Sequence, residues 1–140
     1  MRWMAVDHGT KKIGIAFCDE MEIIASPYAV WPMEGEDTLR KLAALARSEK
    51  AQALLVGIPL HRDGQESATA PPAREFGQAL AKLVDLPLAF VNEHLTSAEA
   101  KRLLGQGGGK PKRRDAKLDA AAAAVMLQEY IDGGKAGGLT

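Results

Sequence analysis

The sequence is poor in the residue types that support several common classes of protein. Its only cysteine, Cys18, cannot form a disulfide within the chain, and we interpret it as a small buried hydrophobic side chain. A membrane span needs about eighteen consecutive apolar residues, and no stretch of the sequence comes close to that length. Even the run from Ala120 to Leu127 is short and mostly alanine. Aromatic residues make up 5% of the chain, with Tyr28, Trp31 and Phe90 scattered, which argues against a base-stacking platform.

Length and composition favour one compact domain over residues 1–140. A chain of 140 residues that is 46% apolar and 26% charged can bury one core, but not two. The first residues, MRWMAVD, lack a charged segment followed by a long apolar stretch, so we expect a cytoplasmic protein. We expect a loose tail over residues 133–140.

The net charge of zero hides a strong asymmetry along the chain. Residues 1–100 carry a net charge of −4, residues 101–117 of +6 and residues 118–140 of −2. The basic segment contains a glycine-rich stretch that cannot be helical, so we predict a flexible basic loop over about residues 105–115. A solvated loop that serves solubility and a localisation signal are the alternatives to a binding role. The basic side chains of this loop are Lys110, Lys112, Arg113 and Arg114.

Hydrophobic periodicity predicts an α/β fold. Two short apolar runs joined by a glycine-containing turn indicate an antiparallel hairpin, and helices then alternate with continuous apolar strands that suit a sheet covered by helices on both faces. The predicted sheet is mixed and has five strands. Its strands span Trp3 to Asp7, Ile13 to Cys18, Ile23 to Val30, Ala53 to Ile58 and Leu88 to Asn92. The predicted helices cover about residues 36–49, 73–83, 97–104 and 116–131, the third opening with a capping box at Thr96.

Three acidic residues stand at positions that favour a shared site. Asp7 and Glu93 each follow an apolar strand, and sites form outside the carboxyl ends of parallel strands. Asp119 shares one stripe of the last predicted helix with mainly apolar positions, so its carboxylate needs a partner. A metal ion, a salt bridge to Lys or Arg, and the positive end of the helix dipole are all possible partners.

Three converging carboxylates would suit phosphodiester hydrolysis. Two divalent ions about 4 Å apart can activate water, neutralise the developing charge and fix the in-line geometry. Hard carboxylate oxygens favour Mg²⁺ or Mn²⁺ over zinc, for which His8, His61 and His94 are too scattered. We therefore interpret Asp7, Glu93 and Asp119 as catalytic, metal-binding residues of a nuclease.

Motifs across nearly the whole chain resemble the YqgF/RuvX family in order and spacing. They are Asp7-His8-Gly9-Thr10-Lys11-Lys12-Ile13-Gly14, Val56-Gly57-Ile58-Pro59-Leu60-His61-Arg62-Asp63-Gly64, Asn92-Glu93-His94-Leu95-Thr96-Ser97, Lys112-Arg113-Arg114 and Leu118-Asp119-Ala120-Ala121-Ala122. The resemblance implies an RNase H-like fold related to RuvC-type resolvases, with Asp7, Glu93 and Asp119 at the family's acidic triad. It also implies either 5′-end maturation of pre-16S ribosomal RNA or resolution of Holliday junctions.

Three positions depart from the usual pattern of that family. The family more often has Asp-Glu-Arg where this chain has Asn92-Glu93-His94, and asparagine where it has His61. The triad itself is intact. The replacements bear on substrate preference and on phosphate contacts near Glu93.

The expected partner is structured RNA or branched DNA, and no membrane; a homodimer is possible. Lys11 and Lys12 on the hairpin turn, together with the basic loop, suit contacts to a phosphate backbone, and His61 and Arg62 follow a strand at the same sheet edge. A noncatalytic nucleic-acid-binding module is the main alternative. A remoter one is an actin-like phosphate- or ATP-binding domain, because Asp7 to Gly14 also resembles the first phosphate-binding hairpin of that class.

Overall fold

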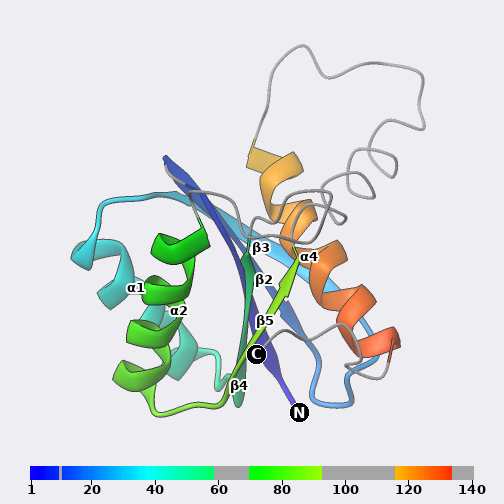
Figure 1. Cartoon of the computed structure of the whole chain (residues 1–140). Helices are drawn as coiled ribbons and strands as arrows, with labels where there is room; N and C mark the ends of the chain where they lie inside the picture. Colours follow the sequence, from blue (N-terminus) through cyan, green and yellow to red (C-terminus); the bar gives the residue numbers. More distant parts are fainter. Residues whose placement is uncertain (10, 59–69, 93–115, 134–140) are drawn as a thin grey trace, which may run out of the picture.

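The computed structural model describes residues 1–9, 11–58, 70–92 and 116–133, with backbone alone for residues 92 and 116–119 (Figure 1). The predicted helix at 97–104, the basic loop and residues 134–140 lie outside these ranges. Within them the predicted elements are confirmed. They are β1 (Trp3–His8), β2 (Lys12–Cys18), β3 (Ala25–Pro32), α1 (Glu36–Ser48), β4 (Ala53–Ile58), α2 (Ala70–Val84), β5 (Leu88–Asn92) and α4 (Ala116–Asp132).

The five strands form one mixed sheet in the order β3-β2-β1-β4-β5. The pairs β1/β2 and β2/β3 are antiparallel, as the hairpin prediction requires, whereas β1/β4 and β4/β5 are parallel. The carboxyl ends of β1, β4 and β5 therefore meet at one edge of the sheet. The turn between β2 and β3 lies at the opposite edge.

Helices cover both faces of the sheet, which confirms the predicted layers (Figure 1). On one face, Met4 and Val6 of β1 belong to a core with α1 and α2. On the other face, Trp3 and Ala5 belong to a second core with α4. Because successive side chains of a strand point to opposite faces, this alternation fixes the face on which each later residue of β1 lies.

The contact between α4 and the sheet is built largely from small side chains. Ala123 and Ala124 of the helix share a buried core with Ala5 and Ala16 of the sheet. Small residues on both sides let the helix axis come close to the strands, while Leu127 fills the space further along the helix. The alanine run is thus a packing surface.

Two elements begin two or more residues away from the predicted start. Strand β3 begins at Ala25 and not at Ile23, because the Asp19 carboxylate accepts the N–H groups of Ile23 and Ile24 and holds both residues in the turn. Helix α2 begins at Ala70, three residues before the first apolar position of its pattern. The prolines at 71 and 72 fit there, because the first-turn N–H groups of a helix have no partner within the helix.

Gly77 of α2 marks a close approach between that helix and the sheet. A Cβ atom at this position would lie 2.9 Å from Phe90 Cε1 and 3.2 Å from Val56 Cγ2. We expect Gly77→Ala to lower the free energy of unfolding by about 1–2 kcal/mol, because overpacking outweighs the gain in helix propensity. Urea denaturation would measure this, with the exposed neighbour Gln78→Ala as control; a stabilised Gly77→Ala protein would contradict the close packing.

Candidate active site at the carboxyl edge of the sheet

Asp7 lies near the end of β1 and is flanked by glycine on both sides. In the sheet register it pairs with Gly14 of β2 and with Gly57 of β4. Directly paired residues share a face, so neither neighbouring strand places a side chain beside the Asp7 carboxylate. Asp7 itself is half-buried. On this face the sheet therefore has no side chain directly beside Asp7 on either neighbouring strand, and the next side chains at this level are those of Val30 on β3 and Val91 on β5.

The surface of the sheet around Asp7 faces α4. Trp3 and Ala5 precede Asp7 at two-residue intervals and pack against that helix. On β4, Leu55 packs in the same core, two residues before Gly57. The alternation on both strands thus places Asp7 and Gly57 on the α4 side of the sheet.

Helix α4 brings position 119 to the level of Asp7. The Trp3 and Tyr130 rings meet edge to face, with centroids 5.3 Å apart, at the amino end of β1. From Trp3 to Asp7 the strand rises about 13 Å. From Tyr130 back to Asp119 the helix rises about 16 Å. In Figure 1, α4 begins at the carboxyl edge of the sheet and runs towards the amino end of β1, so its start lies at the same end of the sheet as Asp7.

The predicted packed stripe of α4 is confirmed at every position that is described. Position 119 heads this stripe, four residues into the helix. The stripe positions that follow are all buried, and they are Ala122, Ala123, Met126, Leu127 and Tyr130. The backbone therefore puts Asp119 on the side of α4 that faces the sheet.

Strand β5 leads to the third acid. Val91 pairs with Gly57 in register and packs in the α4 core. Glu93 follows Val91 by two positions in the sequence and lies outside the described residues. Among the described residues no group of three His, Cys, Asp or Glu side chains could hold a metal ion, and of the proposed triad only the Asp7 side chain is among them.

The hairpin turn places two basic residues at the same edge as Asp7. Lys11 and Lys12 are exposed, and the Lys11 carbonyl accepts the N–H of Met33 at 2.8 Å. A Cβ atom on Gly9 would lie 2.5 Å from the Lys12 carbonyl oxygen, so the turn requires glycine there. The described residues of this connection thus place the positive charge of Lys11 and Lys12 at the same edge as Asp7.

His8 lies next to Asp7 but on the other face of the sheet. Its ring packs against Phe76 of α2 with centroids 5.1 Å apart. Burial lowers the pKa of His8, so its imidazole is neutral at pH 7 and contributes no charge at this edge. The remaining predicted nucleic-acid contacts lie outside the described residues; they are His61, Arg62, Lys110, Lys112, Arg113 and Arg114.

Two features of the site were not predicted from the sequence. Gly14 and Gly57 look like ordinary strand glycines until the register sets them on either side of Asp7. The alanine run of α4 looks like a generic helix-forming segment until its packing against the sheet is known. Glycines inside strand patterns, which often mark a close approach, were the available signal.

The chain is similar to known proteins over nearly its whole length. A family model described as RuvX, Holliday junction resolvase, matches residues 1–133. The chain is 34% identical over 132 residues to a putative pre-16S rRNA nuclease of Roseiflexus sp., covering 94% of each chain. It is 35% identical over 138 residues to a protein of that name from Syntrophomonas wolfei, covering 98% of each.

The fold agrees with a solved structure. RuvC of Thermus thermophilus, in complex with a Holliday junction substrate, matches with a TM-score of 0.63 at 15% identity, over 99% of both chains. The fold is therefore RNase H-like, as the sequence motifs implied. The match of the family model and the identity to these relatives, each across nearly the whole chain, show that the chain belongs to the RuvX family.

Proposed function

We propose that this protein is a metal-dependent nuclease that hydrolyses phosphodiester bonds with Asp7, Glu93 and Asp119. One observation carries the proposal: on the face that α4 covers, the register partners of Asp7 on both neighbouring strands are glycines, and the start of α4, which contains position 119, lies at the same end of the sheet. The two glycines leave space beside the Asp7 carboxylate for an ion and a phosphate. Membership of a nuclease family supports this reading.

The donor set fits Mg²⁺ or Mn²⁺. Asp7 offers carboxylate oxygens, the hard ligands that these ions prefer, and the triad contains no thiol or imidazole. Asp7, Glu93 and Asp119 would together hold the ions, in a site that we propose takes two of them. Bound ions of this kind neutralise phosphate charge and lower the pKa of a water nucleophile. The amino end of α4 would add favourable electrostatic potential for the acids and for the phosphate.

The chain's basic residues would position the substrate. Lys11 and Lys12 are exposed at the edge where Asp7 lies, so they suit contacts to the phosphate backbone. Such contacts hold nucleic acid without reading its sequence, which fits recognition by shape. We propose that Arg62, His61 and the basic loop act in the same way, in the cytoplasm.

The substrate is ribosomal RNA precursor, branched DNA or both. The sequence relatives carry the name putative pre-16S rRNA nuclease, whereas RuvC is bound to a Holliday junction. One preparation should be tested on a pre-16S RNA fragment, a four-way DNA junction and linear duplex DNA, with Asp7→Asn as the control for contaminating nuclease. Metal-dependent cleavage of the RNA or the junction, absent in the variant, is expected. Equal cleavage by the variant, or none on any substrate, would reject the proposal.

A noncatalytic nucleic-acid-binding module is the rival function. It predicts affinity for nucleic acid in EDTA that added metal leaves unchanged, with no cleavage under any metal. The glycines on either side of Asp7 argue against it, because they leave space for an ion and a phosphate beside a carboxylate that a binding-only surface does not need.

The basic loop offers a separate prediction. If Lys112, Arg113 and Arg114 contact phosphates, changing all three to alanine should flatten the slope of log Kd against log salt by up to about three charges. Thermal stability should stay close to that of the parent. Fluorescence anisotropy at several salt concentrations would measure the slope, and an unchanged slope would show that the cluster is only a solvated loop.

A further inference from the structure

The turn between β2 and β3 exposes a group of apolar side chains at the end of the sheet opposite Asp7. Met21 is 76% exposed, Ile23 60% and Ile24 62%, and Tyr28 of the edge strand β3 is 49% exposed. We call these four residues the tip surface. Apolar side chains exposed together on one turn commonly mark an interaction site.

The tip surface is held in one conformation. The Asp19 carboxylate accepts the N–H groups of Met21, Ile23 and Ile24 at 3.1, 2.8 and 2.8 Å. These bonds lower the pKa of Asp19, so the carboxylate stays ionised well below neutral pH. Glu22 adopts a positive φ of 56°, which non-glycine residues rarely accept. A turn without a binding role would not need these three hydrogen bonds and the unusual φ of Glu22 to hold its apolar side chains in place.

Helix α4 fixes the same turn from its other side. The Gln128 side chain accepts the N–H of Ala25 at 2.8 Å and donates to the Ile23 carbonyl at 2.9 Å. The turn that carries the exposed side chains is therefore anchored to the helix that packs over β2, β3 and β1. A partner would lose little conformational entropy from this turn on binding.

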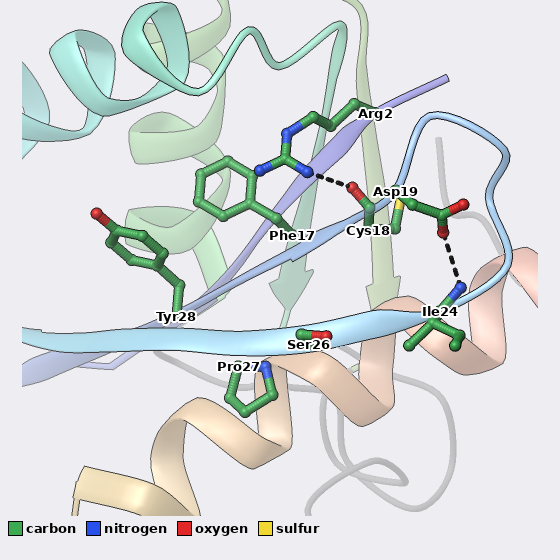
Figure 2. A pocket seen from close by; sticks show the side chains of 8 residues that line it. All are labelled: Arg2, Phe17, Cys18, Asp19, Ile24, Ser26, Pro27 and Tyr28. Atoms are coloured by element: carbon green, nitrogen blue, oxygen red, sulfur yellow. Dashed lines mark hydrogen bonds between the residues drawn. The ribbon is translucent and has the colours of Figure 1, made fainter.

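A cavity of about 290 Å³ adjoins the tip surface (Figure 2). Ile24, Pro27, Phe17 and Tyr28 line it, and the Phe17 and Tyr28 rings meet edge to face at 5.3 Å. The Arg2 guanidinium lies over the Phe17 ring at 4.8 Å and donates to the Cys18 carbonyl at 2.9 Å. The cavity has a mainly apolar wall and a size that suits one large side chain of a partner.

Acidic residues surround the tip surface. Asp19, Glu20 and Glu22 all belong to the turn; the chain's amino group pairs with Glu22 at 3.3 Å, and Arg2 is balanced by Glu49 at 2.8 Å, so two net negative charges remain here. Phosphate groups would be repelled here. A second copy docked about a two-fold axis would bring like charges together. A partner with basic residues around an apolar centre is complementary.

The edge strand restricts how such a partner can bind. Pro27 and Pro32 lie within β3 and provide no N–H groups. Prolines on an edge strand oppose the addition of another strand. Side-chain docking, as by the apolar face of an amphipathic helix, remains open.

We propose that the tip surface and its cavity dock an amphipathic, basic segment of another protein, with one large apolar side chain seated in the cavity. The nuclease edge would stay free, because Met21, Ile23 and Ile24 lie at the other end of the sheet and Tyr28 lies on its far edge strand, two strands away from β1. The proposal does not depend on the nuclease assignment.

Site-specific photocrosslinking in the native host cell tests this interaction. The photoreactive amino acid p-benzoylphenylalanine would replace Met21. In a matched control it would replace Leu83, which is 44% exposed on α2, the helix that packs on β4 and β5 at the side of the sheet away from β3. Mass spectrometry would map the crosslinked peptides. We expect position 21, but not position 83, to join one protein segment with apolar residues flanked by Lys or Arg.

A charge variant and an apolar variant complete the test. In Glu20→Gln with Glu22→Gln, we expect the crosslink yield to fall by about three- to tenfold through loss of complementary charge. Ile23→Ser should abolish the crosslink while nuclease activity and thermal melting stay near those of the parent. Crosslinks to RNA, to a second copy of this chain or to an acidic segment would overturn the proposal, as would yields equal at positions 21 and 83 or unaffected by the variants.

Discussion

Replacing Asp7 with asparagine is expected to lower the rate of phosphodiester cleavage by about 10³-fold or more, because several kcal/mol of transition-state charge stabilisation is lost. Although it nearly abolishes cleavage, the same change should not lower thermal stability when metal is absent. Three carboxylates held together without metal repel one another, so in EDTA Asp7→Asn should melt at or above the temperature of the parent. Mg²⁺ or Mn²⁺ should raise the melting temperature of the parent alone, since only the parent gains binding free energy.

A structural role for Asp7 predicts the reverse result. If Asp7 served only to balance a buried cation, its removal would cost about 3–5 kcal/mol with or without metal. Thermal melts of both proteins in EDTA and in each metal separate the two cases. A variant that is destabilised in every buffer, beside a parent indifferent to metal, would argue against the nuclease site.

Enlarging Ala123 on α4 should have the second largest effect. Its side chain is fully buried in the core between α4 and the sheet. Ala123→Leu would push the helix away from Ala5 and Ala16 and lower the free energy of unfolding by about 1–3 kcal/mol. Because the same helix carries Asp119, cleavage should fall by about a hundredfold even where the protein is fully folded.

The neighbouring alanine provides the control. Ala121 is only half-buried, so Ala121→Leu should leave both stability and cleavage near the parent values. Urea denaturation and single-turnover cleavage, measured at a temperature where all three proteins are folded, would show the difference. Full cleavage by Ala123→Leu would mean that the spacing between α4 and the sheet does not set the geometry of the site.

Most of the fold was predictable because its apolar patterns are strong and unambiguous. The continuous apolar run of β4 and the helical spacing of Leu39, Leu42 and Ala46 leave little choice of element type. The predicted start of β3 was wrong by two residues, because the Asp19 carboxylate accepts hydrogen bonds from the N–H groups of Ile23 and Ile24 and holds both residues in the turn. A side-chain hydrogen bond of this kind has no periodic signature in the sequence.

The candidate site was predictable only in part. Asp7 could be placed because a polar residue at the end of an apolar strand signals a site. The roles of Gly14 and Gly57 could not be, because they depend on the register of three strands. The tip surface was not predicted for a different reason: Ile23 and Ile24 were assigned to the start of a strand, and only the turn geometry shows them to be exposed.

Binding of Mn²⁺ to the parent and to three single variants tests the proposed site most directly. Electron paramagnetic resonance would measure free Mn²⁺ in titrations of the parent, Asp7→Asn, Glu93→Gln and Asp119→Asn, each checked for folding by its thermal melt. A shared site predicts that every variant binds Mn²⁺ at least about tenfold more weakly than the parent, since each removes a charged ligand. Parent-like Mn²⁺ binding by any one of the folded variants would contradict a site built from all three acids.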